Sequence, residues 1–357
     1  MRSFTFLSLA LLLAAAGCGS GGNDSPAATS SRYLDAPLPG GGVGLYVEGT
    51  LAREAGDGDR ALALLNRSVE ADDRLILANQ ALGEIYRERG DLEQSERWFR
   101  RLVSLDPRTA RGHFLLGGVL ELQERLADAL AAYRDGLAIE PQDPEGNLGV
   151  GRILLAQDQP AEAVEPLRIG VAARPDDAEA TINFGRALTA AGRFDEGESA
   201  LRRGLELLAA DQDRLRNETL LALGLNLARQ GRGTEAASLL EEAANALGTP
   251  ESFKIAGDAH AAVGNGHIAT GRPADAGDSF ATAVGWYDRA IDLSPGYVAA
   301  LNAKGAALIR QWQAGGRIDN ATRDRALDAW RASLAADPDQ PNVTQAIEQY
   351  ESAGLFE

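Results

Sequence analysis

Proline and glycine recur along this 357-residue chain at a fixed interval, and that interval limits the possible folds more than any other feature. Proline stands at Pro107, Pro141 and Pro175, which lie 34 residues apart. Glycines in the first half of each interval keep the same spacing, at Gly49, Gly83, Gly117, Gly151 and Gly185. A period of this length is typical of solenoids, in which neighbouring copies bury one another's apolar faces. A compact bundle would not explain the fixed period.

Each copy of the period predicts two amphipathic helices joined by a short turn. In the second copy, the small residues Gly83 and Ser95 let the two helices approach closely, and Phe99 fills the space between them. Gly90 supplies the turn, since glycine adopts conformations that other residues avoid. Pro107 ends the second helix, because the residue before a proline disfavours the helical conformation. The building block is therefore a helix-turn-helix unit.

This pattern closely resembles the tetratricopeptide repeat. The small residue of the second helix recurs in most copies, at Ala61, Ala129, Ala163, Ala236, Ala283 and Ala326. The first aromatic position of the motif, which is degenerate in the family, holds Asn79, His113, Asn147, Thr181 and Leu220. The resemblance covers most of the chain. It implies an all-α fold, a right-handed α-solenoid of about eight helix-turn-helix units with a concave groove.

The regularity of the period divides the array into two parts. Residues 42–249 hold six regular units, residues 250–340 hold two irregular ones, and residues 341–357 are expected to form a capping helix. Five extra residues precede the sixth unit, fourteen lie in the seventh (NGHIATGRPADAGD) and nine in the eighth (around QAGGRIDNA). We expect the two larger insertions to protrude from one edge of the solenoid and to form a specialised partner surface.

Three of the four tryptophans lie in the irregular part. Trp330 falls at the position that fills the space between the two helices of a unit, and Trp286 adjoins Tyr287 at the equivalent position. Packing is the favoured role for Trp330 and Trp286. Trp312 lies beside an insertion and is the candidate for contact with a partner.

The resemblance also implies which side chains face the groove, because the fifth and ninth positions of the first helix do so in the family. These positions hold four apolar and two basic candidates: Phe114, Leu148, Ile182, Leu221, Arg152 and Arg186. Such a surface suits an extended or helical peptide with apolar anchors and an acidic group. The Lys and Asn of the family's carboxylate clamp are absent. The alternative, that the apolar residues pack against the neighbouring unit, remains open.

The first seventeen residues have the features of a secretory signal. Arg2 precedes an apolar run over residues 4–16 that is too short to span a bilayer as a helix. The small residues Ala15, Ala16 and Gly17 then precede the only cysteine, Cys18. This segment resembles a bacterial lipobox, with Ala15 in place of the usual Leu.

The lipobox resemblance implies cleavage before Cys18, acylation of Cys18 and stable anchoring to a membrane by two or more acyl chains. Residues 18–41, rich in Gly, Ser and Pro, are expected to form a flexible tether. The alternatives are an ordinary cleaved signal with a stray cysteine, and an uncleaved apolar tail.

The formal net charge of −17 argues against a nucleic-acid partner, because phosphate binding depends on Lys and Arg. No P-loop, nucleophile elbow, HExxH or CxxC motif occurs. His260 and His267 could hold a metal if one helix carried both, but Gly264 and Gly266 between them predict a turn. We therefore expect no cofactor, no metal site and no catalytic residue.

Together these features predict a non-enzymatic adaptor: a lipid-anchored solenoid that binds a protein or peptide partner in the bacterial cell envelope. Gly19 after the cysteine resembles the outer-membrane sorting pattern, so we expect an outer-membrane lipoprotein facing the periplasm. Outer-membrane, pilus, secretion and polysaccharide-export assembly are the candidate processes. Two alternatives remain: an enzyme or metal-binding module in residues 250–340, and a passive structural spacer.

Overall fold

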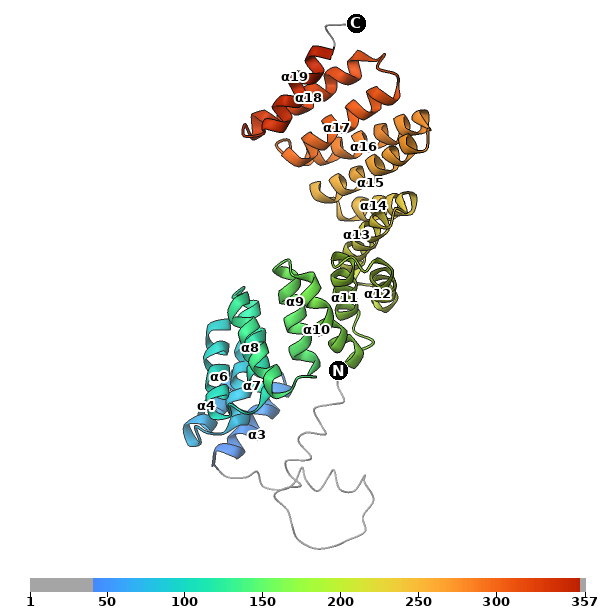
Figure 1. Cartoon of the computed structure of the whole chain (residues 1–357). Helices are drawn as coiled ribbons and strands as arrows, with labels where there is room; N and C mark the ends of the chain where they lie inside the picture. The colour runs from blue at the N-terminus through green and yellow to red at the C-terminus, as the bar shows by residue number, and fades with distance from the viewer. Residues whose placement is uncertain (1–40, 354–357) are drawn as a thin grey trace. The chain divides into compact units, whose positions relative to one another are not determined.

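A computed structural model describes residues 41–353, which form seventeen α-helices, α3 to α19, and no strand (Figure 1). The expected signal at residues 1–17, Cys18 and residues 19–40 of the expected tether lie outside the described residues. Within residues 41–353, no helix combines the length and the apolar character needed to cross a membrane.

In chain order, eight first helices alternate with eight second helices, and one helix follows. The first helices are α3 (Gly41–Glu54), α5 (Ile76–Glu88), α7 (Ala110–Leu122), α9 (Pro144–Ala156), α11 (Ala178–Ala190), α13 (Asp213–Arg229), α15 (Pro250–Ala269) and α17 (Val298–Ala314). The second helices are α4 (Gly58–Ala71), α6 (Leu92–Leu105), α8 (Leu126–Ile139), α10 (Pro160–Ala173), α12 (Phe194–Leu207), α14 (Gly233–Leu247), α16 (Pro273–Leu293) and α18 (Asn320–Ala336). The last helix is α19 (Pro341–Ala353).

The helices belong to two structural units, and the boundary falls in the turn between α7 and α8. Within the first unit, each helix from α3 to α7 packs against its neighbours in the chain, and within the second unit α8 to α19 do the same. Consecutive first helices also touch, as α9 touches α11 and α11 touches α13. This arrangement confirms the predicted all-α solenoid of helix-turn-helix repeats, while its right-handed sense stays a prediction.

The 34-residue period appears in the backbone of the turns as well as in the sequence. One residue in each of five successive turns has a left-handed conformation: Gly56 (φ 80°), Gly90 (φ 77°), Glu124 (φ 60°), Asp158 (φ 56°) and Gly192 (φ 80°). Glycine adopts this conformation without steric cost, so Gly90 has the role that its sequence position predicts. Glu124 and Asp158 adopt it despite their side chains, and at Asp158 the packed helices α9 and α10 determine the path of the backbone.

Aspartate begins several of the helices. The carboxylates of Asp57, Asp91, Asp143 and Asp177 each accept a hydrogen bond from the backbone N–H three residues later. Such caps satisfy a donor that would otherwise lack a partner, and each contributes about 1 kcal/mol. These four aspartates therefore mark where α4, α6, α9 and α11 start.

Within each structural unit, the interior of a helix pair is built around a glycine on the first helix that faces a large side chain on the second. A Cβ added to Gly83, Gly151 or Gly305 would overlap Phe99, Leu167 or Trp330, respectively. Ser95 Oγ donates a hydrogen bond to the Gly83 carbonyl oxygen at 2.7 Å, which holds the two helices together where they are closest. We call this contact the glycine slot. It confirms the predicted packing role of Trp330, and Tyr287 fills the slot opposite Gly257.

The insertion of the seventh pair lengthens its helices, which corrects the expected protruding segment. The regular helices α9 and α10 have 13 and 14 residues, whereas α15 and α16 have 20 and 21. Each is about two turns longer, and the turn between them, residues 270–272, has the regular length. Gly264 and Gly266 therefore lie inside α15 instead of in a turn, and Gly264 packs against Phe280.

The insertion of the eighth pair is distributed over both helices and the turn. Helices α17 and α18 have 17 residues each, and residues 315–319 join them. Helix α19 follows and packs against α18, with Ile347 buried and the Tyr350 ring 6.0 Å from that of Trp330. The insertions thus extend the helical surface itself.

Candidate functional site

The six candidate groove residues have two different environments. Phe114, Leu148 and Ile182 are buried, with exposed fractions of 3 %, 3 % and 2 %. Leu148 packs against Gly170 of α10, and Ile182 packs against Gly204 of α12, so closely that a Cβ on either glycine would overlap the facing side chain. The structure corrects the sequence interpretation here: these three residues are packed in the interior, as the packing alternative proposed. Leu221 is partly buried on α13 and packs against the core around Leu223 and Leu240.

Arg152 and Arg186, in contrast, line one pocket. The pocket has a volume of roughly 440 Å³ and lies between α9, α11 and the start of α10. Its lining residues are Arg152, Leu155, Ala156, Asp158, Pro160, Glu179, Asn183, Arg186 and Ala190. We call it the α9–α11 pocket. Two successive repeats therefore bring the two predicted arginines to the same site.

The helical period explains how α11 contributes one wall. Glu179, Asn183, Arg186 and Ala190 follow one another at intervals of three or four residues, so they lie on one face of the helix. Arg152 and Leu155 do the same on α9, and the left-handed turn residue Asp158 leads to Pro160 at the first position of α10. The pocket is thus formed by the same repeat geometry that forms the core.

The chemistry of the α9–α11 pocket is mixed. Arg186 is exposed and forms no ion pair or side-chain hydrogen bond with any residue in the range 41–353. Asn183 adds an amide, and Asp158 and Glu179 add two carboxylates, while Leu155, Ala156, Pro160 and Ala190 are apolar. A guanidinium offers several donors in a fixed plane and binds carboxylates in a bidentate manner. The set can therefore hold a polypeptide segment through an apolar contact, amide hydrogen bonds and one acidic group.

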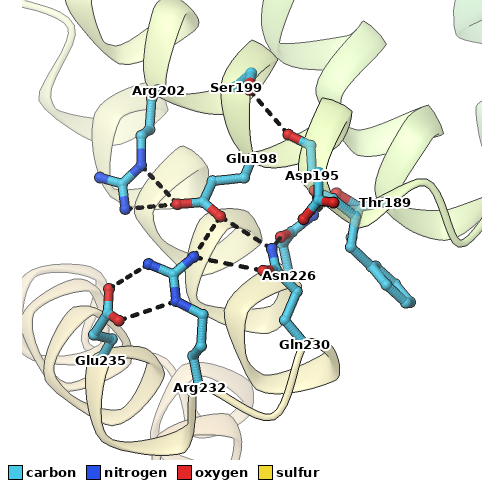
Figure 2. Close-up of polar contacts among 10 residues, drawn as sticks. Thr189, Asp195, Glu198, Ser199, Arg202, Asn226, Gln230, Arg232 and Glu235 are labelled. Atoms are coloured by element: carbon cyan, nitrogen blue, oxygen red, sulfur yellow. Dashed lines mark hydrogen bonds and ion pairs between the residues drawn. The ribbon is translucent and has the colours of Figure 1, made fainter.

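A polar network holds α11 in place on the side facing the next pair (Figure 2). The side-chain amide of Asn226, on α13, is buried and donates to Thr189 Oγ1 at 2.7 Å and to the Phe194 carbonyl oxygen at 3.0 Å. Thr189 lies three residues after Arg186 on α11. The position of the arginine-bearing helix is therefore coupled to α13 by hydrogen bonds as well as by apolar packing.

The same network continues to Glu198 of α12, as Figure 2 shows. Gln230 donates to Asn226 Oδ1 at 2.6 Å and to Glu198 Oε2 at 3.0 Å. Arg232 and Arg202 also donate to the Glu198 carboxylate, at 2.6 Å and 2.9 Å. Burial opposes the ionisation of Glu198, but the hydrogen bonds from Gln230 and Arg202 and the charge of Arg232 lower its pKa below the usual value. Glu198 is therefore the ionised centre that joins α12 to the turn before α14.

Trp312, the candidate partner contact of the irregular part, is only 4 % exposed. Its ring meets the edge of Tyr350, with 6.3 Å between ring centroids. Burial restricts the predicted partner contact of Trp312. The four extra residues at the end of α17 carry Trp312 under α19, and only a small part of the ring lines a surface pocket.

The two histidines do not form a metal site in the described part of the chain. His260 Nε2 lies 2.6 Å from a carboxylate oxygen of Glu241 on α14, so it links neighbouring pairs. Within residues 41–353, no group of three or more His, Cys, Asp or Glu side chains could hold a metal ion.

Sequence reasoning found both arginines of the α9–α11 pocket but missed its other polar lining. Asn183 lies one turn before Arg186, so the helical period is a signal that could have identified it. Two of the partners of Glu198, Gln230 and Arg232, lie in the turn between α13 and α14, 32 and 34 residues away in sequence, and no sequence spacing indicates that they meet it.

The comparison with known proteins agrees with this architecture. Residues 46–107, 81–144 and 149–214 match the tetratricopeptide repeat family, so these parts of the chain consist of tetratricopeptide repeats. No curated protein sequence is significantly similar to the chain.

Several solved structures are similar in fold. The tetratricopeptide repeat protein YrrB, described as having an unusual peptide-binding site, is 19 % identical, with a TM-score of 0.46 over 51 % of this chain and 91 % of YrrB. PilW, a type IV pilus biogenesis factor, is 20 % identical, with a TM-score of 0.47 over 56 % of this chain and 91 % of PilW. PilF of Pseudomonas aeruginosa is 16 % identical, with a TM-score of 0.47 over 56 % of this chain and 89 % of PilF.

Proposed function

We propose that this chain is a lipid-anchored scaffold that binds a segment of a protein partner in the bacterial cell envelope, and that the α9–α11 pocket is its recognition site. Tetratricopeptide repeats serve as protein-interaction modules, which supports the general role. The observation that carries the specific proposal is that Arg152 and Arg186, from successive repeats, line one pocket together with Asn183.

The expected ligand is an extended segment with one acidic residue beside an apolar one. The exposed guanidinium of Arg186 has no partner within residues 41–353, so it can pair with a carboxylate without losing an existing bond. Leu155, Ala156, Pro160 and Ala190 offer the apolar contact. Asp158 and Glu179 select against a strongly acidic ligand, because like charges repel within the same pocket.

The anchor rests on the sequence of residues 1–41. Acylation of Cys18 would hold the chain at a membrane, and residues 19–40 would separate the repeats from the lipid surface. Outer-membrane, pilus, secretion and polysaccharide-export assembly remain the candidate processes. The net charge of −17 supports a lipid anchor over electrostatic adhesion, since an acidic chain is repelled by anionic lipid surfaces.

Site-specific photo-crosslinking tests the recognition site. A photoreactive residue replaces Asn183 in full-length protein expressed in its native cells, and crosslinked partners are identified with and without Arg186→Glu. The matched control is Arg310→Glu, which makes the same charge change at an exposed arginine on α17. We expect Arg186→Glu to remove the crosslink and Arg310→Glu to preserve it. An unchanged crosslink in Arg186→Glu would overturn the role of Arg186 in recognition, and the absence of any crosslink in the wild type would favour the passive spacer.

A separate experiment tests the anchor. Cells that express the chain are labelled with a fatty-acid analogue, and the wild type is compared with Cys18→Ala. Label on the wild type alone supports acylation of Cys18, and equal labelling of the two, or none, rejects it.

A further inference from the structure

The irregular pairs contain a second pocket, and its position follows from the glycine slots. In regular pairs the slot residues are the eighth residues of their helices, as Gly151 is in α9 and Leu167 is in α10. Gly257 and Gly305 are also eighth in α15 and α17, so these helices are extended at their C-terminal ends. Tyr287 and Trp330 are later in α16 and α18, so those helices are extended at their N-terminal ends. The extra residues are therefore 263–269, 273–279, 311–314 and 320–322, and the longer turn is 315–319.

Every residue that lines the second pocket belongs to these extra segments or to the longer turn. The lining comprises Pro273, Ala274, Gly277, Asp278, Gln311, Trp312, Ala314, Gly315, Asp319 and Thr322, around a volume of roughly 380 Å³. We call it the insertion pocket. Its volume lies in the range of about 300–1,000 Å³ that is usual for ligand sites. A regular pair has none of these residues, so the insertions create the pocket.

The charged groups of the insertion pocket are both acidic. Asp278 of α16 is exposed, and its carboxylate forms no ion pair with any residue in the described range. Asp319 begins α18, where its carboxylate accepts hydrogen bonds from the Ala321 N–H at 3.1 Å and the Thr322 hydroxyl at 2.5 Å. The hydrogen bond from Thr322 lowers the pKa of Asp319, so this group stays ionised. No lysine, arginine or histidine is among the ten lining residues.

The surroundings of the pocket favour a cation in spite of two nearby arginines. Arg325 acts on Asp319 by its charge, and Arg317 lies over the Trp312 ring, 5.8 Å from its centroid. Neither lines the pocket. The contact of Arg317 shows that a guanidinium already lies over the indole, as expected because a ring face attracts cations.

We propose that the insertion pocket binds a lysine or arginine side chain of a protein partner, between the carboxylates of Asp278 and Asp319 and beside the Trp312 indole. Pro273, Ala274 and Ala314 contact the aliphatic part of that side chain, and the net charge of −17 speeds its approach. The site differs from the α9–α11 pocket in position and in charge, so the partner would carry a basic group at one site and an acidic group at the other.

A tetra-arginine peptide tests this proposal on the full-length chain in detergent solution. The variant Asp278→Asn/Asp319→Asn removes both charges, and it preserves folding because asparagine caps a helix as well as aspartate does. The control variant Asp292→Asn/Asp328→Asn removes one charge from each of the same two helices, outside the pocket. Binding is followed by calorimetry and by the indole N–H signal of Trp312, which is assigned with Trp312→Phe.

We expect the dissociation constant of the peptide to rise about tenfold in the pocket variant and less than twofold in the control. The Trp312 signal should shift on titration of the wild type. Equal losses in both variants would reduce the interaction to general charge attraction and overturn the proposal. An unchanged dissociation constant in the pocket variant, or an unmoved Trp312 signal, would overturn it too. Arg186→Glu lies outside the insertion pocket and should not weaken binding of the peptide. A negative result for the insertion pocket would therefore not count against the α9–α11 pocket.

Discussion

The regular pairs α9 to α12 and the irregular pairs α15 to α18 use the same interior contact but make different surfaces. In the regular pairs, Gly151 and Gly185 face the leucines Leu167 and Leu201. In the irregular pairs, Gly257 and Gly305 face the larger rings of Tyr287 and Trp330. The regular surface pocket lies between successive pairs, whereas the irregular one is made of extra turns. An insertion can therefore extend both helices of a pair and add a surface pocket, while the glycine slot keeps its position.

The largest expected effect comes from adding a side chain at the glycine of the slot. Gly305→Ala should lower the free energy of unfolding by about 3 kcal/mol, because the new Cβ overlaps the indole of Trp330. That ring cannot retreat easily, since its Nε1 donates to the Asn302 carbonyl oxygen at 3.2 Å. Gly151→Ala should cost less, about 1–2 kcal/mol, because the Leu167 side chain can move away. Urea denaturation measures both, and an equal cost would show that the aromatic slot is no more rigid.

Removing the insertion of the seventh pair tests whether the extra turns are separable. A variant that lacks residues 263–269 and 273–279 retains the turn residues 270–272 and should keep its helical circular dichroism. Its free energy of unfolding should fall by about 2 kcal/mol, because Phe280 loses the cover of Gly264. The tetra-arginine peptide should bind the variant weakly, since Asp278 is deleted. Loss of the helical signal would show instead that the extra turns are needed for folding.

The polar network around Glu198 joins α12 to the next pair in the regular part, and its contribution to stability can be measured separately. Glu198→Gln should lower the free energy of unfolding at pH 7 by about 1 kcal/mol, since the carboxylate accepts hydrogen bonds from two arginines. The pKa of Glu198 in the folded chain is lowered, so its contribution is complete above the usual pKa of about 4.5 and is lost as the pH falls through the lowered value.

Thermal unfolding from pH 7 to pH 3 measures this effect. The difference between wild type and Glu198→Gln should be largest at pH 7 and should shrink as the pH falls below about 4.5. Glu196→Gln, on the same helix, alters a pair with Arg193 alone and serves as the control. A constant difference over the whole range would mean that the ionisation of Glu198 contributes nothing.

The smallest expected effect is a gain. Gly285 lies on the exposed side of α16 with nothing within 4 Å of an added Cβ. Gly285→Ala should therefore raise the free energy of unfolding by about 0.5–1 kcal/mol, because alanine loses less conformational freedom in a helix. Urea denaturation checks the sign. A loss of stability would show that the outer face of α16 is covered, contrary to its exposed position.

The repeats were predictable from the sequence because their determinants are local. The interval between Pro107, Pro141 and Pro175, with Gly83 and Gly151 placed within it, specifies helices, turns and the glycine slot. The slot position of Trp330 followed from the same register. The identification of Arg152 and Arg186 followed from the resemblance to the tetratricopeptide repeat, in which the ninth position of the first helix faces the groove.

Other features depend on side-chain volume and on distant partners. Phe114, Leu148 and Ile182 occupy positions that can either face a groove or pack, and the glycines on the neighbouring helices decide for packing at the latter two. Trp312 is buried because α19 brings Tyr350 to its ring, which its own segment does not indicate. Gly264 stays helical because Phe280 packs against it, and such packing outweighs the weak helix propensity of glycine.

The sequence therefore predicts the class of fold, the number of repeats and the glycine slot within the pairs. It also leads us to expect a lipid anchor at Cys18. These properties follow from the order of small, large and turn-forming residues along the chain. The tertiary structure alone shows which side chains reach the surface, how the insertions are divided between helices, and that Arg152 and Arg186 line one pocket while Asp278 and Asp319 line another. Those outcomes depend on how helices distant in sequence fill the space beside one another.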